Sequence, residues 1–241
     1  MKFKRAFTLA EVLITLVIIG VVAAITLPAL RSDVDKTAFA TGLKTNISIL
    51  NNGFRQIMVN DDTDDMRNTT LWIDYLRPIA GTPDITTDMK VEMSKFFKID
   101  KVELAQDSSK KFYGFDNTER TFPAGAVRFY LGNSAILMMT FLEDNGRTAC
   151  TTEQSYCNPV ASIILDVNGD KGPNTIGKDI YYLDLGEDGF VYPYGSKAVH
   201  EFSDGVPEWD TEEGCQGKNP SVSGESCAGR VVDEGFKINY F

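Results

Sequence analysis

The first thirty residues constrain this chain most, because a basic start is followed by a long uncharged apolar run. Between residues 7 and 30 the only charge is Glu11, and residues 12–30 are nineteen uncharged, mostly aliphatic positions. That run is long enough to cross a hydrocarbon core of about 30 Å. Basic residues before an apolar span stay on the cytoplasmic side, so we expect the rest of the chain to be exported. The basic residues are Lys2, Lys4 and Arg5.

The position of the small-residue junction decides whether this span is kept. A cleaved signal peptide ordinarily has its cut site after the apolar run. Here the junction beside the basic end, Ala6-Phe7, precedes the run, so a cut there leaves the span on the mature protein. A carboxylate such as Glu11 costs up to about 2.5–3.5 kcal/mol at mid-bilayer depth and needs a partner. The new amine at Phe7 would provide one; the alternative is a signal anchor with Glu11 among the lipid headgroups.

The stretch from Lys4 to Glu11, KRAFTLAE, followed by the aliphatic span, resembles the class III signal of type IV pilins and type II secretion pseudopilins. The resemblance implies that a prepilin peptidase cuts after Ala6 and methylates Phe7. It also implies that Glu11 neutralises the amine of a neighbouring subunit during assembly, and that Pro28 is the helix-kinking proline. The family usually has glycine where this chain has Ala6. The match covers about thirty of 241 residues.

The resemblance also predicts the domain organisation and the partners. Residues 1–6 would be the leader, 7–30 the transmembrane and filament-core helix, 31–60 its amphipathic continuation, and 61–241 a globular domain. The partners would be the prepilin peptidase and methyltransferase, other pilin or pseudopilin subunits, an inner-membrane assembly platform and membrane lipid. The protein would cross the inner membrane once, with a cytoplasmic N-terminus and an extracytoplasmic domain, and enter a periplasmic or extracellular filament after assembly.

Beyond the span, apolar residues recur every three or four positions, which places them on one face of a helix. This predicts a helix that continues to about residue 60 and bends at Pro28, where a backbone hydrogen bond is lost. Its apolar face is expected to pack on the globular domain. The residues are Phe39, Leu43, Ile47, Leu50, Phe54 and Ile57.

The sequence after residue 60 predicts an α+β fold, in which the long N-terminal helix packs on a C-terminal antiparallel sheet of four or five strands. This pilin-like layout is also what the resemblance implies. Short helices are expected at 70–77 and 87–98, separated by proline and glycine. The expected strands are a hairpin over 126–142, then 160–167, 180–185, 190–194 and 236–241.

The net charge indicates which partners to expect, and the cysteine content indicates whether the domain contains disulfides. The net charge is −10, or −13 without the leader, and an acidic domain is a poor match for a nucleic-acid backbone, so we expect no nucleic acid. Four cysteines in an exported domain predict two disulfides. Local pairing is preferred because each pair brackets a short polar loop, while a zinc site would need closer spacing. The predicted pairs are Cys150–Cys157 and Cys215–Cys227.

One loop between predicted strands has oxygen ligands at alternating positions, which suits a hard cation such as Ca²⁺. The loop departs from the EF-hand template, because Lys171 and Gly177 stand where glycine and a bidentate glutamate are needed. The alternative is a turn whose side chains hydrogen-bond their own backbone. The candidate ligands are Asp166, Asn168, Asp170 and Asp179.

The sequence offers no enzyme chemistry. There is no nucleophile elbow or phosphate loop, and the single histidine, His200, stands in a polar segment. The first hypothesis is therefore a structural subunit of a type IV pilus or a secretion or DNA-uptake pseudopilus. The alternative is a monomeric, membrane-tethered extracytoplasmic binding domain with a pilin-type anchor.

Overall fold

The computed structural model describes residues 8–76, 85–104, 111–121, 126–141, 159–197, 208–210, 214–215 and 223–241. The chain divides into two compact units, residues 1–38 and 39–241. Helix α1, Leu9–Asn60, begins in the first unit and ends in the second.

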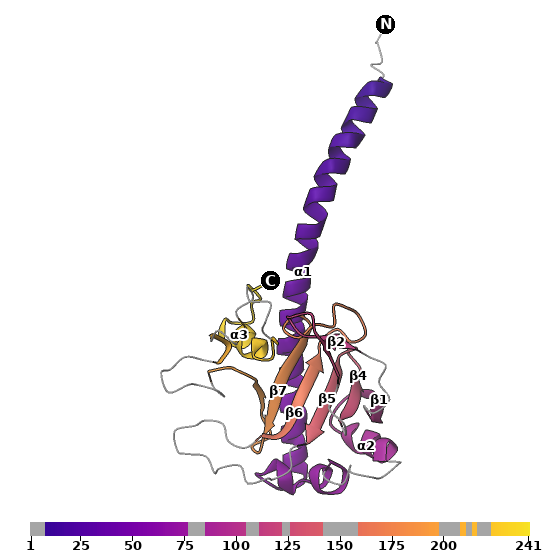
Figure 1. Cartoon of the computed structure of the whole chain (residues 1–241). Coiled ribbons are helices and arrows are strands. Elements are labelled where there is room, and N and C mark those ends of the chain that lie inside the picture. Colours follow the sequence, from indigo (N-terminus) through magenta and orange to yellow (C-terminus); the bar gives the residue numbers. More distant parts are fainter. Residues whose placement is uncertain are drawn as a thin grey trace. The chain divides into compact units, whose positions relative to one another are not determined.

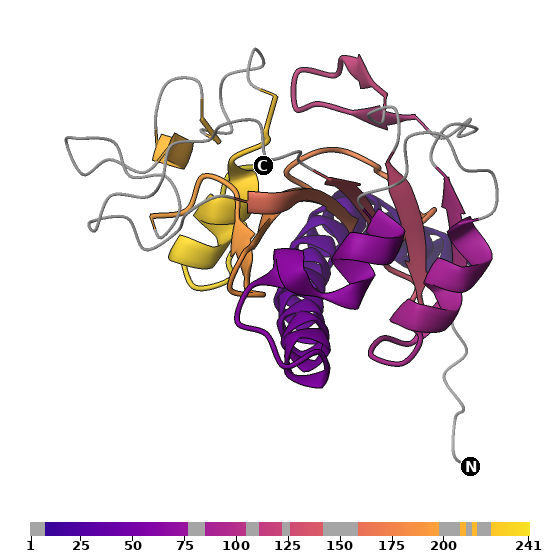
Figure 2. The ribbon, with the colours of Figure 1, turned by 90° about the horizontal axis from the view of Figure 1, so that it is seen from below.

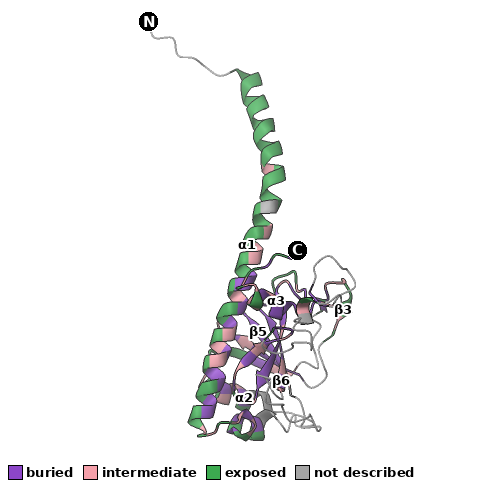
Figure 3. Ribbon diagram, turned by 90° about the vertical axis from the view of Figure 1, so that its left-hand side faces the viewer, coloured by how far each residue is buried: buried purple, intermediate pink, exposed green. Residues whose placement is uncertain are grey.

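The part of α1 in the first unit exposes its aliphatic side chains. Leu13, Ile18 and Leu27 are 54–63% exposed, and Figure 3 shows this stretch coloured almost entirely as exposed. The helix continues through Pro28. Exposed aliphatic side chains along a helix of this length are expected to be covered by lipid or by other proteins.

The part of α1 in the second unit carries the predicted apolar face into the core. Phe39, Leu43, Leu50, Phe54 and Ile57 are at most 7% exposed, and Ile47 is half-buried. Asn46 is also buried, and its Oδ1 accepts a hydrogen bond of 2.9 Å from Asn133 Nδ2 in a strand-connecting turn. The second part of α1 therefore runs to Asn60 with this apolar face buried in the core.

The core of the second unit is a six-stranded antiparallel sheet with the order β1-β4-β5-β6-β7-β8. Consecutive strands β4 to β8 are neighbours, so the sheet is a meander with β1 at its edge (Figure 1). The strands are β1 Ile99–Leu104, β4 Val127–Leu131, β5 Ile136–Phe141, β6 Pro159–Asp166, β7 Ile180–Gly186 and β8 Val191–Pro193.

The sheet has two differently covered faces. Side chains such as Phe129, Leu137 and Leu165 pack in the same core as the second part of α1. The opposite face, which we call the outer face, carries a second apolar cluster that includes Met138 and Ile164. The two-stranded sheet of β2, Phe112–Tyr113, and β3, Glu119–Arg120, lies on the outer face, because Phe112 belongs to that cluster (Figure 2).

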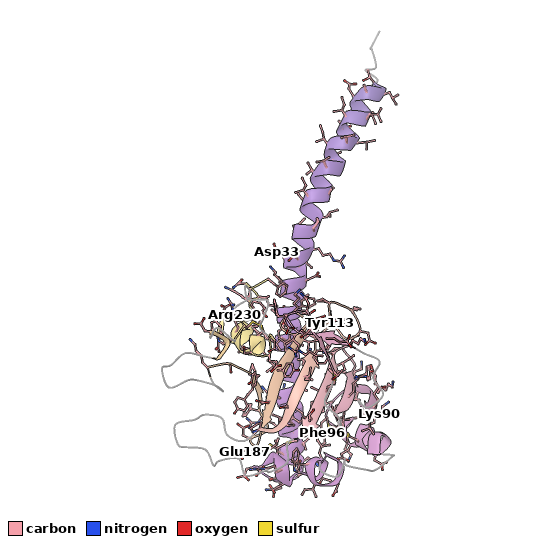
Figure 4. All side chains as sticks on the ribbon, viewed as in Figure 1. Asp33, Lys90, Phe96, Tyr113, Glu187 and Arg230 are labelled. Carbon is pink, nitrogen blue, oxygen red and sulfur yellow. A yellow bond between two sulfur atoms is a disulfide. The ribbon has the colours of Figure 1, made fainter. Side chains whose placement is uncertain are left out.

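The remaining elements are short. They lie at the ends and edges of the sheet, with α2 against β1 and α3 beside β7 and β8. Tyr113 of β2 and Glu187, which follows β7, are labelled at opposite ends of the sheet in Figure 4. The elements are the 3₁₀ helix η1 Met66–Asn68, the π-helix η2 Leu71–Leu76, α2 Ile85–Met93, the 3₁₀ helix η4 Glu208–Asp210 and α3 Cys227–Asp233.

The fold class is confirmed, with four corrections of detail. The sheet has six strands, and one of them, β1, was not predicted. The helix expected over 87–98 ends at Met93. The helix expected over 70–77 is a π-helix. Residues 236–241 form no strand: Phe236 has a φ of 60°, and Ile238 and Tyr240 are buried side chains of the α1 core.

Candidate functional site

The candidate assembly residue, Glu11, lies in the first turn of α1 and is bonded to Thr8 there. Glu11 Oε2 accepts hydrogen bonds from the Thr8 backbone N–H (2.8 Å) and from Thr8 Oγ1 (2.9 Å). Thr8 Oγ1 in turn accepts from the Glu11 N–H at 3.3 Å. This reciprocal arrangement is a capping box, which satisfies two backbone donors that a helix N-terminus otherwise leaves unpaired.

The capping role of Thr8 was not predicted. The signal was available, since Thr8-x-x-Glu11 before an apolar run is the sequence pattern of a capping box. The two predicted processing residues, Ala6 and Phe7, lie outside the residues that the structure describes.

The helix that follows contains a stretch long and apolar enough to cross a membrane. An 18-residue window within Leu9–Asn60 has a mean hydropathy of 2.7, and none of that window is buried. Length and composition alone therefore allow a transmembrane segment here.

Comparison with protein families finds one match at this end of the chain. Residues 1–27 match the family model described as the prokaryotic N-terminal methylation motif. The chain carries a prepilin signal of the type IV pilin and pseudopilin class. Neither the curated proteins nor the solved structures contain a match to the chain.

The prepilin signal supports a type IV pilin-like or pseudopilin protein. It implies processing by a prepilin peptidase and assembly with other pilin subunits. With the apolar helix, it fits a membrane-anchored protein that has a C-terminal domain. Pilin-type subunits are in general structural and not enzymatic.

A disulfide joins Cys215 to Cys227 at the start of α3, with a Cα–Cα distance of 4.9 Å. This confirms one of the two predicted local pairs. The other pair, Cys150–Cys157, lies outside the described residues, as does His200. Arg230 supports the bridge from the next turn of α3, because its Nη1 donates to the Cys215 carbonyl at 2.6 Å.

The loop between β6 and β7 holds the four candidate metal ligands, and two of them already accept backbone hydrogen bonds. Asp166 Oδ1 accepts from the N–H groups of Asn168 (3.1 Å) and Gly169 (2.8 Å). Both oxygens of the buried Asp179 accept at 2.8 Å, from the N–H groups of Asn174 and Thr175. Burial raises the pKa of Asp179, and these backbone bonds oppose the rise.

These contacts are those of a turn whose side chains hydrogen-bond their own backbone, which is the alternative to a calcium site. Among the described residues there is no group of three or more His, Cys, Asp or Glu side chains arranged to hold a metal ion. The observation that favours a cation is Asn168 Oδ1, which is buried and accepts no hydrogen bond. A buried oxygen without a donor is costly unless a cation or water satisfies it. Calcium binding therefore stays a prediction.

The outer face of the sheet carries a charged network that the sequence did not reveal. The Glu103 carboxylate accepts from Arg128 Nη1 at 2.8 Å, from Tyr130 at 2.5 Å, and from Lys101. Partial burial raises the pKa of Glu103, but the three hydrogen bonds outweigh it and lower that pKa to about 2. Arg128 is 2% exposed, so this carboxylate helps to hold a buried cation.

Proposed function

We propose that this protein is a structural subunit of a type IV pilus or a type II secretion pseudopilus. A prepilin peptidase would process it, and its N-terminal helix would drive assembly. The observation that carries the proposal is the prepilin signal over residues 1–27, which includes the start of a helix whose large aliphatic side chains from Leu9 to Leu30 are exposed. In a filament, neighbouring helices would cover these side chains.

Glu11 would set the register between subunits. Its carboxylate is held at the first turn by Thr8, next to the position at which cleavage would create the Phe7 amine. A neighbour's amine could replace the Thr8 donors, and a charge-assisted hydrogen bond contributes about 1.5–3 kcal/mol. Because the Thr8 bonds are given up in exchange, the net gain is about 1 kcal/mol, and its loss would lower the association constant by roughly fivefold.

Substitution of Glu11 tests the mechanism. The Glu11→Ala protein should still be inserted and processed, as shown by a mature mass that lacks residues 1–6, but should give roughly fivefold fewer filaments that sediment. Asp33→Ala is a matched control, since Asp33 is an exposed acid of the same helix beyond the apolar span. Normal filament yield from Glu11→Ala would refute the role of Glu11.

The mass of the mature N-terminus, together with cross-linking of neighbouring anchors in the membrane, distinguishes a filament subunit from a monomeric tethered domain. Purified protein that retains Met1, together with an absence of cross-links between neighbouring anchors, would support the tether and exclude the filament. A mature N-terminus at Phe7 with anchor-to-anchor cross-links would support the filament.

We also propose that the loop between β6 and β7 binds calcium through oxygens that include Asn168 Oδ1. A bound cation stabilises the folded state by about 2.7 kcal/mol at a hundred times its dissociation constant. Calcium at millimolar concentration should therefore raise the melting temperature of the full chain, and Asn168→Leu should abolish the rise. The absence of both a calcium-dependent heat and a melting shift would end this proposal.

A further inference from the structure

The outer face of the sheet contains a cavity of about 180 Å³ beside the start of the loop between β6 and β7. Four apolar side chains from β2, β5 and β7 line it, and each is at most 3% exposed: Phe112, Ile136, Met138 and Ile180. An apolar protein cavity of about 150 Å³ is large enough to hold a benzene molecule. The volume of this cavity therefore suits a molecule with a single six-membered ring.

The charged side chains that border the cavity are engaged within the chain. Arg128 Nη1 donates to the Glu103 carboxylate at 2.8 Å, and the Lys111 ammonium is paired with Glu119 of β3 at 2.9 Å. Asp166 Oδ1 accepts from two backbone N–H groups of the following loop. An ionised ligand would lose its hydration here and gain no uncommitted charge in return. The lining therefore favours a neutral ligand.

Two of the apolar side chains favour an aromatic ring over an aliphatic one. Phe112 offers a ring, and a pair of aromatic rings is more stable than the area that it buries would predict. Met138 offers a thioether sulfur, which makes favourable contacts with aromatic rings. Both side chains line the cavity and belong to the apolar cluster of the outer face. A bound ring would therefore lie beside both.

The cavity opens to solvent at a polar rim, while the strand above it is held in place. Lys111, with a side chain that is 60% exposed, and the exposed Asp170 form part of the lining. The Tyr113 N–H donates to the Asn174 carbonyl at 2.9 Å, near the end of the sheet where Figure 4 labels Tyr113. This bond ties β2, which carries Phe112, to the loop between β6 and β7. A small ligand can therefore enter at the rim without displacing β2.

From this arrangement we propose that the cavity binds a neutral molecule built on one aromatic ring, of about the size of benzene. The volume sets the size of the ligand, and the engaged charges disfavour an ionised one. Phe112 and Met138 select an aromatic ring. The site does not depend on filament assembly, so it can be tested on unassembled protein.

Methyl NMR of the full chain in detergent tests this inference, with benzene as the probe and EDTA present to exclude calcium. Strand β5 provides a matched pair of reporters, because Met138 lines the cavity and the next residue, Met139, lies in the α1 core. We expect benzene to shift the Met138 methyl resonance saturably and to leave that of Met139 in place. Both reporters experience the same free benzene concentration, whatever the detergent takes up. No saturable shift of Met138, or equal shifts of both resonances, would overturn the inference.

Matched probes then test the class of ligand. N-Methylpyridinium has the shape of toluene but carries a charge, so it should bind at least roughly fivefold more weakly than toluene. Cyclohexane resembles benzene in size but has no aromatic ring, and it should bind roughly twofold to tenfold more weakly than benzene. Equal binding within either pair would overturn the proposed class of ligand.

Substitutions in the lining and at the rim then place the ring in this cavity. Phe112→Leu keeps an apolar side chain but removes the aromatic one, so it should weaken benzene binding roughly twofold to tenfold and leave cyclohexane binding unchanged. Lys111→Gln and Asp170→Asn change charges at exposed positions and should leave benzene binding unchanged. Benzene binding that is unaffected by Phe112→Leu, or lost in either rim variant, would overturn the assignment. The comparison of Met138 with Met139 needs no variant, so it decides the inference even if Phe112→Leu does not fold.

Discussion

Gly53 of α1 gives the sharpest test of how the helix packs on the domain. A Cβ at this position would lie 2.1 Å from Cε1 and 2.2 Å from Cζ of Phe97. The Phe97 ring cannot move freely, because it is 4% exposed and packs edge-on against Phe54 with ring centroids 5.2 Å apart. We therefore expect Gly53→Ala to destabilise the domain, although alanine is the better helix former.

Two opposing terms set the size of the effect. Carbon atoms in contact lie about 3.5–4.0 Å apart, so the ring must retreat by roughly 1.5 Å to accept a methyl group. Overpacking of this kind costs about 1–3 kcal/mol. Alanine regains up to about 1 kcal/mol relative to glycine in a helix interior. The net expectation is a loss of about 1–2 kcal/mol in the free energy of unfolding.

Urea denaturation of the full chain in detergent, followed by tryptophan fluorescence, measures this loss as a lower midpoint at an unchanged slope. Gly20→Ala is the matched control, since Gly20 is a glycine of the same helix with nothing within 4 Å of the added Cβ. Its midpoint should not fall. Phe97→Leu should relieve the clash, so in a double-mutant cycle Gly53→Ala should cost at least about 1 kcal/mol less in that background. A midpoint raised by Gly53→Ala, or a coupling of zero, would refute the packing described for α1.

Three further predictions concern the domain. Replacing both Cys215 and Cys227 by serine should lower the free energy of unfolding by about 3 kcal/mol, measured with urea, because the bridge closes a loop with a sequence separation of 12. Tyr240→Phe should cost about 1–3 kcal/mol in the same assay, since the Tyr240 hydroxyl donates to the buried Gly177 carbonyl at 2.6 Å. The lowered pKa of Glu103 contributes stability that is complete above about pH 4.5 and is lost as the pH falls towards 2. Between those pH values wild-type protein should lose about 1–2 kcal/mol more than Glu103→Gln, a figure reduced for solvent screening.

Periodicity and turn residues were enough to predict most of the fold. The three-four spacing of apolar residues predicted α1 as far as Asn60, and the Gly-Asn-Ser turn at 132–134 predicted the β4–β5 hairpin. Strand β1, IDKVEL, was missed because its alternation is weak: a bulge between Ile99 and Lys101 breaks the register. The last six residues were misread as a strand because aromatic side chains that pack in a core also have high β-propensity.

The two candidate sites differ in how far the sequence could predict them. The assembly motif is local, so a continuous stretch of residues revealed it, and a closer reading would have found Thr8 as well. The charged network on the outer face could not be predicted, because Glu103 and Arg128 become neighbours only through the pairing of β1 with β4. The acidic loop was ambiguous for a different reason: the same carboxylates suit a cation or their own backbone N–H groups.

The capping box at the start of α1 limits how much energy Glu11 can contribute to assembly. Its carboxylate already accepts two hydrogen bonds from Thr8, and pairing with a neighbour's amine exchanges those bonds for new ones. A cap of this kind contributes about 0.5–2 kcal/mol and a charge-assisted bond about 1.5–3 kcal/mol, so the net gain is near 1 kcal/mol. The aliphatic side chains of residues 12–30 offer many more contacts than Glu11. Helices that associate in lipid do so through the fit of their surfaces, and this fit alone does not fix their axial position. On the proposed function, affinity would therefore come from the aliphatic surface, and Glu11 would select the one register in which a neighbour's amine replaces Thr8.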